Sequence, residues 1–356
     1  MYFSLGVKTR REDFFDMERE LESLERALLD PLTRMVVVKG LRRTGKSSLM
    51  RVALGELGLP HILIDPRLAG PLTPESLYDH FSAELSKLLE DSGLRRLLSR
   101  VKGVEVAGLR LEFTERRVDV LGRVLAEVGR WAEGRQVILA IDEAQDLRSI
   151  RGFDRLLAYI YDHVSGIKLL LAGSEVGVLD RFIGVGDPRA PLYGRPFVEV
   201  TLERLSRERA LEFLEAGFQQ VGVRVAREEL EEAVSALDGV IGWLTFYGYL
   251  RSRGAPDALS RAVEEGSRLA AEEFRSFLSA RQLARRRYVE VMRTLVRPST
   301  WSEVKRALSR VASVSDKQVS HYLKELVHYG FVEKRGELYA IADPLLLEAV
   351  RRGYVA

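Results

Sequence analysis

The segment that most constrains the fold is VVVKGLRRTGKSSL, residues 36–49. A run of β-branched residues ends at Gly40, and Gly45, Lys46 and Ser47 follow at the spacing GxxxxGK[ST]. Glycine at these two positions lets the backbone curl so that successive N–H groups point at a phosphate. A helix that begins near Lys46 adds the partial positive charge of its N-terminus. With a strand before it and a helix after it, the segment predicts a phosphate-binding loop.

The loop also assigns chemical roles to its side chains. Lys46 would neutralise charge on the β- and γ-phosphates, and the Ser47 hydroxyl would be a ligand of Mg²⁺. The side chains of Arg42 and Arg43 lie at variable positions of the motif, so they either face a partner or are solvated. The residues expected to contact the nucleotide are Gly40, Arg43, Thr44, Gly45, Lys46, Ser47 and Ser48.

A pair of acidic residues supports the same chemistry. The segment VILAIDEAQ places Asp142 at the carboxyl end of an apolar strand, where the sites of α/β proteins lie. We expect Asp142 and Ser47 to hold Mg²⁺, and Glu143 to orient or deprotonate the attacking water. ATP and Mg²⁺ are therefore the expected cofactors, with ADP as the product. The base-reading Asn-Lys-x-Asp motif of GTP-binding switch proteins cannot occur, because the chain has no asparagine.

Strands and helices alternate through the first part of the chain. This pattern predicts an α/β fold with a parallel sheet that helices cover on both faces. The expected strands are 34–40, 61–66, 136–147, 166–176 and 195–202. The expected helices are 16–29, 46–57, 74–92 and 118–133, with a hairpin at 104–113 that is either a functional insertion or edge protection.

The pattern then changes twice. Only helices are expected from 202 to 280. From 281 the order is helix, helix, helix and a two-stranded wing, which is typical of a winged helix-turn-helix. Capping boxes start two of these helices, at Thr300 with Glu303 and at Ser315 with Gln318. We therefore expect three domains, at 1–201, 202–280 and 281–356.

Composition narrows the class of protein. The chain has 356 residues, 46% hydrophobic and 30% charged, without an apolar run long enough to cross a membrane. It has no cysteine, and its five histidines show no ligand spacing. A cytoplasmic protein without a membrane partner is expected. Residues 281–356 carry 15 Lys/Arg and 8 Asp/Glu, a net charge of +7, which leaves −4 for residues 1–280. An anionic partner is therefore expected at the C-terminal end.

Duplex DNA is the partner that this end favours. In the helix 315–329 the apolar positions recur at helical spacing and should face inward, which leaves polar and basic side chains outward on the helix that would enter a major groove. The wing tip adds basic residues for phosphates. The predicted DNA contacts are Lys317, Gln318, His321, Lys324, Lys334 and Arg335. Winged helices also serve as protein-packing modules, and Glu325 and Glu333 interrupt this surface.

The motifs GLRRTGKSSL, LAIDEAQ, LLLAGSEVGVL and APLYGR together resemble the archaeal ATPase family within the AAA+ class of P-loop NTPases. The resemblance covers nearly the whole chain, and archaeal replication initiators and STAND signalling ATPases are more distantly similar. It implies a helical lid at 202–280, a polar sensor role near the γ-phosphate for Ser174, and a role in hydrolysis for Arg195, as an arginine finger of the same or a neighbouring subunit. Two departures concern the lid. The segment GVIGWL, 239–244, lacks the family's proline, and a clear second sensor arginine is missing. The aromatic residues Trp243, Phe246 and Tyr247 form either the lid core or a base-stacking platform.

Three hypotheses follow. The first is a slow ATPase that couples hydrolysis to movement of the lid and the winged helix. The second is a DNA-binding module in which ATP is mainly structural. The third is a STAND-like scaffold that forms a homo-oligomer with ATP and uses the winged helix for protein contacts.

Overall fold

The computed structural model describes residues 1–69, 72–132 and 134–355, and the contacts within the chain divide it into two compact units. The sheet unit comprises Val7–Gly40 and Lys46–Leu202. The C-terminal unit comprises Met1–Gly6, Leu41–Gly45 and Glu203–Ala356.

A five-stranded parallel sheet forms the centre of the sheet unit, as the sequence predicts. Its strand order is β2-β5-β6-β1-β7. Every residue of the three inner strands is buried, which explains why these segments are continuous apolar runs rather than alternating ones. The strands are β1 (Met35–Gly40), β2 (His61–Ile64), β5 (Val137–Ile141), β6 (Ile167–Gly173) and β7 (Val198–Leu202).

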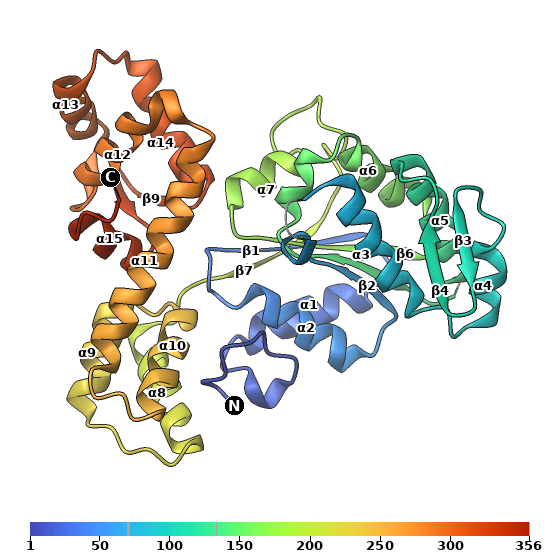
Figure 1. Cartoon of the computed structure of the whole chain (residues 1–356), viewed down its shortest axis with the longest axis horizontal. Helices are drawn as coiled ribbons and strands as arrows, with labels where there is room; N and C mark the ends of the chain where they lie inside the picture. The colour runs from blue at the N-terminus through green and yellow to red at the C-terminus, as the bar shows by residue number, and fades with distance from the viewer. Residues whose placement is uncertain (70–71, 133, 356) are drawn as a thin grey trace. The chain divides into compact units, whose positions relative to one another are not determined.

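Helices cover both faces of this sheet. Alternate strand residues such as Met35 and Val37 join a large core with the apolar faces of α3, α5 and α6. The helices α1 and α2 lie on the other face (Figure 1). The helices of the unit are α1 (Glu18–Leu29), α2 (Lys46–Leu57), α3 (Pro74–Ser86), α4 (Ser92–Leu98), α5 (Val118–Trp131), α6 (Phe153–His163) and α7 (Val176–Phe182), with 3₁₀ turns η1 (Arg11–Asp13), η2 (Pro66–Ala69) and η3 (Ala144–Ser149).

One helix prediction needs adjustment, whereas the predicted hairpin forms. The helix expected over 74–92 ends at Ser86, and α4 begins after Asp91, whose carboxylate caps it by accepting the N–H groups of Gly93 and Leu94. The hairpin forms from β3 (Val104–Ala107) and β4 (Arg110–Phe113). Its buried Phe113 packs edge-on against Tyr78 of α3, with ring centres 5.2 Å apart. The hairpin therefore covers α3.

The strands also end earlier than predicted at the carboxyl edge of the sheet. The segment after β5 turns into η3, with Glu143 in the left-handed region at φ 46°. The segment after β6 turns into α7. Polar residues that follow a buried strand thus leave the ladder and present their side chains at the sheet edge.

The C-terminal unit begins with four helices, as predicted for the lid. They are α8 (Arg207–Gln220), α9 (Arg227–Leu237), α10 (Ile241–Ser252) and α11 (Ala258–Ser279). Trp243 and Tyr247 are almost fully buried among them, which makes these two rings part of the lid core rather than a base-stacking platform.

The N-terminal segment completes the lid. The Phe3 ring lies between α8 and α10, where added Cβ atoms on Gly217 and Gly248 would each come within 2.3 Å of it. Phe3 also makes edge contacts with Phe213 and Phe218. The first six residues therefore group with the lid, and not with residues 7–201 as expected.

A winged helix follows the lid. The two belong to one compact unit, so the boundary predicted at residue 280 does not separate two units. The reason is α11, whose C-terminal half, including Phe274 and Phe277, lies in the core of the winged helix. The remaining elements are η4 (Gln282–Ala284), α12 (Arg285–Thr294), β8 (Ser299–Thr300), α13 (Trp301–Val311), α14 (Asp316–His328), β9 (Val332–Arg335), β10 (Leu338–Ile341) and α15 (Pro344–Arg351). The wing is a three-stranded sheet of order β8-β10-β9, and both predicted capping boxes form.

Among the described residues, none of the helices combines the length and the apolar composition that crossing a bilayer requires.

Candidate nucleotide site and its surroundings

The loop between β1 and α2 has the backbone that its glycines predict. Gly40 and Gly45 have φ values of 154° and 98°, and Arg43 between them has a φ of 65°. Positive φ is the region that glycine adopts without steric cost. The Thr44 hydroxyl donates to the Leu41 carbonyl at 2.9 Å and holds the curl. α2 begins at Lys46, so the N–H groups of its first turn follow the loop directly.

The sequence-predicted metal ligands come together in the sheet unit. The Ser47 hydroxyl donates to Oδ2 of Asp142 at 2.5 Å. The Glu143 N–H donates to Oδ1 at 3.0 Å. Burial raises the pKa of Asp142, and the Arg67 guanidinium and the Ser47 hydroxyl oppose that rise.

Glu143 is held in one orientation by residues of two strand ends. Its Oε2 accepts the Ser174 N–H at 2.9 Å, the Ser174 hydroxyl at 2.8 Å and the Gln145 amide at 2.6 Å. Burial raises the pKa of Glu143, but the charge of Lys46 and these hydrogen bonds outweigh it, so the pKa lies below its usual range. Gln145 in this rotamer lies close against Gly173, where an added Cβ would come within 2.2 Å of the Gln145 side-chain Oε1. Ser174 therefore contacts the predicted catalytic carboxylate directly.

An arginine that the sequence analysis missed also reaches these acids. Arg67, in η2 after β2, donates from Nη2 to Oδ2 of Asp142 at 2.6 Å and from Nε to Asp65 at 2.9 Å. Its Nη1 lies 3.6 Å from Glu143. The segment LIDPR repeats the strand-then-acid pattern of LAIDEA. This repeat could have identified Asp65 and drawn attention to Arg67.

Ser48 and Arg195, two other predicted site residues, have protein partners. The Ser48 hydroxyl accepts the Lys8 N–H at 3.0 Å. Arg195 forms two hydrogen bonds with Asp162 at the end of α6, at 2.9 and 2.5 Å. It precedes β7, and β7 starts beside the beginning of β1. Because the strands are parallel, Arg195 lies at the amino edge of the sheet, and Asp142 at the carboxyl edge. Within one sheet unit, this placement does not favour action on the same chain's nucleotide.

The side chains of the loop arginines are not solvated. The Arg43 guanidinium stacks on the Trp243 indole at 4.0 Å and pairs with Glu273 of α11 at 2.5 Å. Its carbonyl accepts the Gly242 N–H at 3.0 Å. An added Cβ on Gly242 would lie 2.7 Å from the Arg43 Cβ. The lid segment without proline thus contacts the loop through a glycine, and Arg43 would contribute to a phosphate site through its backbone.

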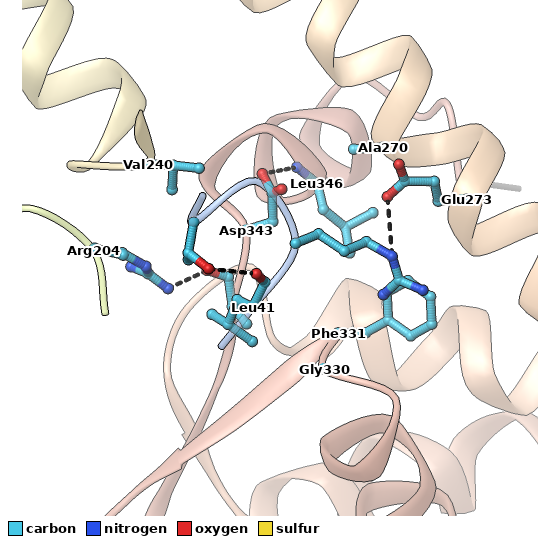
Figure 2. Close-up of a pocket in the computed structure, with 12 residues that line it drawn as sticks. Leu41, Arg204, Val240, Ala270, Glu273, Gly330, Phe331, Asp343 and Leu346 are labelled. Carbon is cyan, nitrogen blue, oxygen red and sulfur yellow. Dashed lines mark hydrogen bonds and ion pairs between the residues drawn. The ribbon is translucent and has the colours of Figure 1, made fainter. Parts of the chain in front are cut away.

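Arg42 faces the winged helix. Its Nη1 donates to the Tyr329 carbonyl at 3.2 Å, and its guanidinium lies 5.4 Å from the centre of the Phe331 ring. Figure 2 shows the junction, where the loop meets Glu273 of α11, Phe331 and Asp343 around a cavity of about 20 Å³. This volume is about the size of one water molecule. Burial raises the pKa of Asp343, and the charge of Arg43 opposes that rise.

The predicted DNA-reading helix has the expected faces. Val319, Tyr322, Leu323 and Leu326 of α14 are buried. The exposed residues on the other side are Lys317, Gln318, Ser320, His321 and Lys324, with Lys334 and Arg335 exposed on the wing. Several of these have partners within the winged helix. The Gln318 side-chain carbonyl caps its own helix, the Ser320 hydroxyl accepts the Trp301 indole N–H at 3.1 Å, and Arg335 pairs with Glu333. His321 lies 3.7 Å from Glu325, and Lys334 lies over the Tyr339 ring.

Glu325 is mostly buried but still reaches this surface, because its Oε2 lies 3.7 Å from Nε2 of His321. It bonds to Arg281 and to the Tyr288 hydroxyl beneath α14. Burial raises its pKa, but the hydrogen bonds from Arg281 and Tyr288 lower the pKa below its usual range. The carboxylate therefore anchors α14 to the rest of the winged helix.

The donor set suits a magnesium nucleotide. Mg²⁺ takes oxygen ligands, and proteins that bind it with nucleotides supply one or two of them while phosphates and waters supply the rest. Ser47 and Asp142 provide two adjacent oxygens in this structure. Among residues 1–69, 72–132 and 134–355, no group of three or more acidic or histidine side chains is arranged to hold a metal alone. Ser47 and Asp142 together would suit a metal that a nucleotide also binds.

Comparisons with known proteins agree with this geometry. A family model described as an ATPase domain predominantly from Archaea matches residues 14–245. The model of the MCM protein C-terminal winged helix-turn-helix domain matches residues 282–342. A comparison with curated proteins found no match.

Solved structures include a Walker-type ATPase of Pyrococcus abyssi, 32% identical over 99% of this chain and 100% of that chain, with a TM-score of 0.81. Two others have only a distant likeness. The Aeropyrum pernix ORC1 protein, solved in complex with DNA, is 16% identical over 98% of this chain and 93% of that chain, with a TM-score of 0.45. The Thermotoga maritima RuvB Holliday junction branch migration motor is 13% identical over 95% and 96%, with a TM-score of 0.47.

Because the archaeal ATPase model covers well over half of the chain and the Pyrococcus abyssi ATPase matches it from end to end, this chain belongs to the family of P-loop ATPases of the AAA+ class found predominantly in Archaea, with a C-terminal winged helix.

Proposed function

We propose that this protein binds and hydrolyses ATP and uses the nucleotide to change the position of its lid and winged helix. The proposal rests on the contacts of the Arg43 side chain. This residue sits inside the phosphate-binding loop, and its guanidinium is held by Trp243 and Glu273 of the lid. The Trp243 indole donates to Asp343, the residue that caps α15 of the winged helix, at 3.1 Å. A change in the conformation of the loop would therefore act on both the lid and the winged helix through side-chain contacts.

Chemical roles in this proposal follow from the geometry. Lys46 and the loop N–H groups would bind the phosphates, and Ser47 and Asp142 would hold Mg²⁺. The bound metal would offset phosphate charge. Glu143 would orient the attacking water and accept its proton, and Ser174 would keep the Glu143 carboxylate in place.

Hydrogen–deuterium exchange on the full chain tests the coupling. The Glu143→Gln variant with ATP and Mg²⁺ should stay loaded, because general-base removal typically costs 10²–10⁴-fold in rate. We expect nucleotide to change the exchange of residues 241–252 and 331–346 in this variant. A second Lys46→Ala change in the same background is the matched control and should abolish both nucleotide binding and the exchange difference. Identical exchange of 331–346 with and without bound ATP would contradict the coupling.

Duplex DNA is the proposed partner of the winged helix. The supporting observation is the exposed row of Lys317, His321 and Lys324 on α14 in a region of net charge +7. Basic residues on an exposed helix can meet phosphates and base edges in a major groove. A gel-shift titration at low salt, with and without ATP, tests this. If tens of micromolar protein give no shift, the winged helix is a protein-binding element, as in the scaffold hypothesis.

A further inference from the structure

Arg67 is a cation in direct contact with the acids of the site. Its guanidinium bridges Asp65 and Asp142 by hydrogen bonds of 2.9 and 2.6 Å, and approaches Glu143 at 3.6 Å. The register of β2 and β5 explains this cluster. Ile64 pairs with Ile141, so the next residue of each strand, Asp65 and Asp142, emerges side by side at the same edge.

The oxygen that Arg67 uses is the oxygen that a metal needs. Oδ1 of Asp142 accepts the Glu143 N–H, which leaves Oδ2 as the atom that faces Ser47. Arg67 donates to this same Oδ2. A cation that bonds to Ser47 Oγ and Asp142 Oδ2 together must therefore replace the Arg67 contact, because the two positive charges would compete for one atom.

The two acids and Arg67 differ in the exposed fraction of their side chains. The side chains of Asp65 and Asp142 are 10% and 6% exposed, and that of Arg67 is 48% exposed. Arg67 lies in the short turn η2 rather than in a strand. The acids are thus held by the sheet edge, while the guanidinium can leave Asp142 toward solvent and still keep its bonds to Asp65.

We propose that Arg67 is an exchangeable counter-ion of Asp142, which Mg²⁺ displaces when it binds with the nucleotide. This inference rests on the proposed nucleotide site. Arg67 is a positioning residue in this role. It neutralises the paired acids before metal entry, weakens metal binding without nucleotide, and makes stable metal binding depend on the phosphates that accompany the ion.

Mn²⁺ binding to the full chain without nucleotide tests the proposal, with electron paramagnetic resonance at about pH 8 to count free ion. We expect Arg67→Ala to bind Mn²⁺ at least about tenfold more tightly than the wild type, because a charge in contact with the site is removed. Arg116→Ala is the matched control, since Arg116 pairs with a different acid of the same unit, Asp79. A second Asp142→Asn change should abolish the gain in Arg67→Ala.

Thermal unfolding gives a second measurement, made first in EDTA and then with Mn²⁺ after the EDTA has been removed. Arg67→Ala should melt at a lower temperature than the wild type, because the acids lose their counter-charge, and Mn²⁺ should restore the loss. Equal Mn²⁺ affinity of Arg67→Ala and wild type, a gain that survives Asp142→Asn, or a melting loss that Mn²⁺ does not restore would each overturn the proposal. These measurements use no ATP. If Arg67→Ala binds Mn²⁺ more tightly as expected but the protein binds no ATP, Arg67 is supported as the counter-ion and the proposed function is contradicted.

Discussion

The guanidinium carbon of Arg43 lies 4.0 Å from the centre of the Trp243 indole ring. On its edge, the same indole donates a hydrogen bond to Asp343. Trp243 therefore contacts a residue of the phosphate loop and a residue of the winged helix at once. This arrangement explains why an arginine at a variable position of the loop is not solvated.

Arg43→Ala should loosen the lid and the winged helix together. It removes a cation–π contact, an ion pair with Glu273 and the approach of Arg43 to Asp343. We expect a loss of about 1–3 kcal/mol in the free energy of unfolding, measured by denaturant titration of the full chain. Arg43→Lys should recover only part of the loss, because an ammonium group cannot stack on an aromatic ring or form two parallel hydrogen bonds to a carboxylate as a guanidinium does. Full recovery by Arg43→Lys would show that stacking and guanidinium geometry contribute nothing beyond the positive charge.

Ser174→Ala should change the pH dependence of ATP hydrolysis more than nucleotide affinity. The Ser174 hydroxyl donates to Glu143 and lowers the pKa of that carboxylate. Without this donor the pKa of Glu143 rises, and the rate depends on the ionised carboxylate. The acidic limb of the rate profile should therefore move to higher pH. A profile that keeps its position while the rate falls would assign Ser174 a different role.

Arg195→Ala should retain ATP binding and lose turnover if the guanidinium acts on a neighbouring subunit. Within one sheet unit, Arg195 bonds to Asp162 at the edge opposite Asp142. The measurement is turnover of Arg195→Ala mixed with Glu143→Gln, since a mixed assembly can pair one intact arginine with one intact carboxylate. Each variant alone is the control. Undiminished activity of Arg195→Ala would leave the residue with its structural ion pair only.

Lys168→Met should destabilise the sheet unit. Lys168 is fully buried in β6, and its ammonium donates to the carbonyls of Ala27, Leu28 and Asp30 at the end of α1. Leaving these acceptors unpaired should cost about 2–4 kcal/mol in unfolding free energy.

The pH dependence of this difference has a definite sign. Burial lowers the pKa of Lys168 to about 8, below its ordinary value of 10.5. Between these two pH values the unfolded chain binds more protons than the folded one, so the contribution of this group to stability rises with pH. The difference in unfolding free energy between the wild type and Lys168→Met, measured by chemical denaturation, should therefore increase from about pH 8 upward. A difference that shrinks over this range would contradict the assignment.

Lys317→Ala with Lys324→Ala should weaken duplex DNA binding and flatten its salt dependence. Removing one lysine–phosphate interaction should reduce the slope of log K against log salt by up to about one unit. Lys87→Ala with Lys102→Ala, which removes two exposed lysines of the sheet unit, is the matched control. A similar decrease in affinity for both double variants would indicate nonspecific attraction rather than binding through α14.

Much of the fold follows from local patterns in the sequence. Short segments rich in apolar residues identified the five parallel strands, and the two capping boxes identified the starts of α13 and α14. Where local signals compete, the boundaries shifted. Asp91 starts a new helix inside a segment that reads as one, because its side chain caps the backbone there.

The candidate site was predictable where spacing along the chain sets the geometry. Lys46 and Ser47 follow the loop at fixed positions, and Asp142 and Glu143 follow a buried strand, so the sequence alone determined that they are candidate ligands and base. The tertiary structure decided what these residues touch. Glu143 meets Ser174 because β5 and β6 are neighbours. Arg67 reaches Asp142 because β2 pairs with β5 in one register. Arg43 meets Trp243, far along the chain, because Gly242 lacks a side chain and lets the two backbones approach. Such interactions depend on strand order and on close packing between distant segments. The local spacing of residues determines neither.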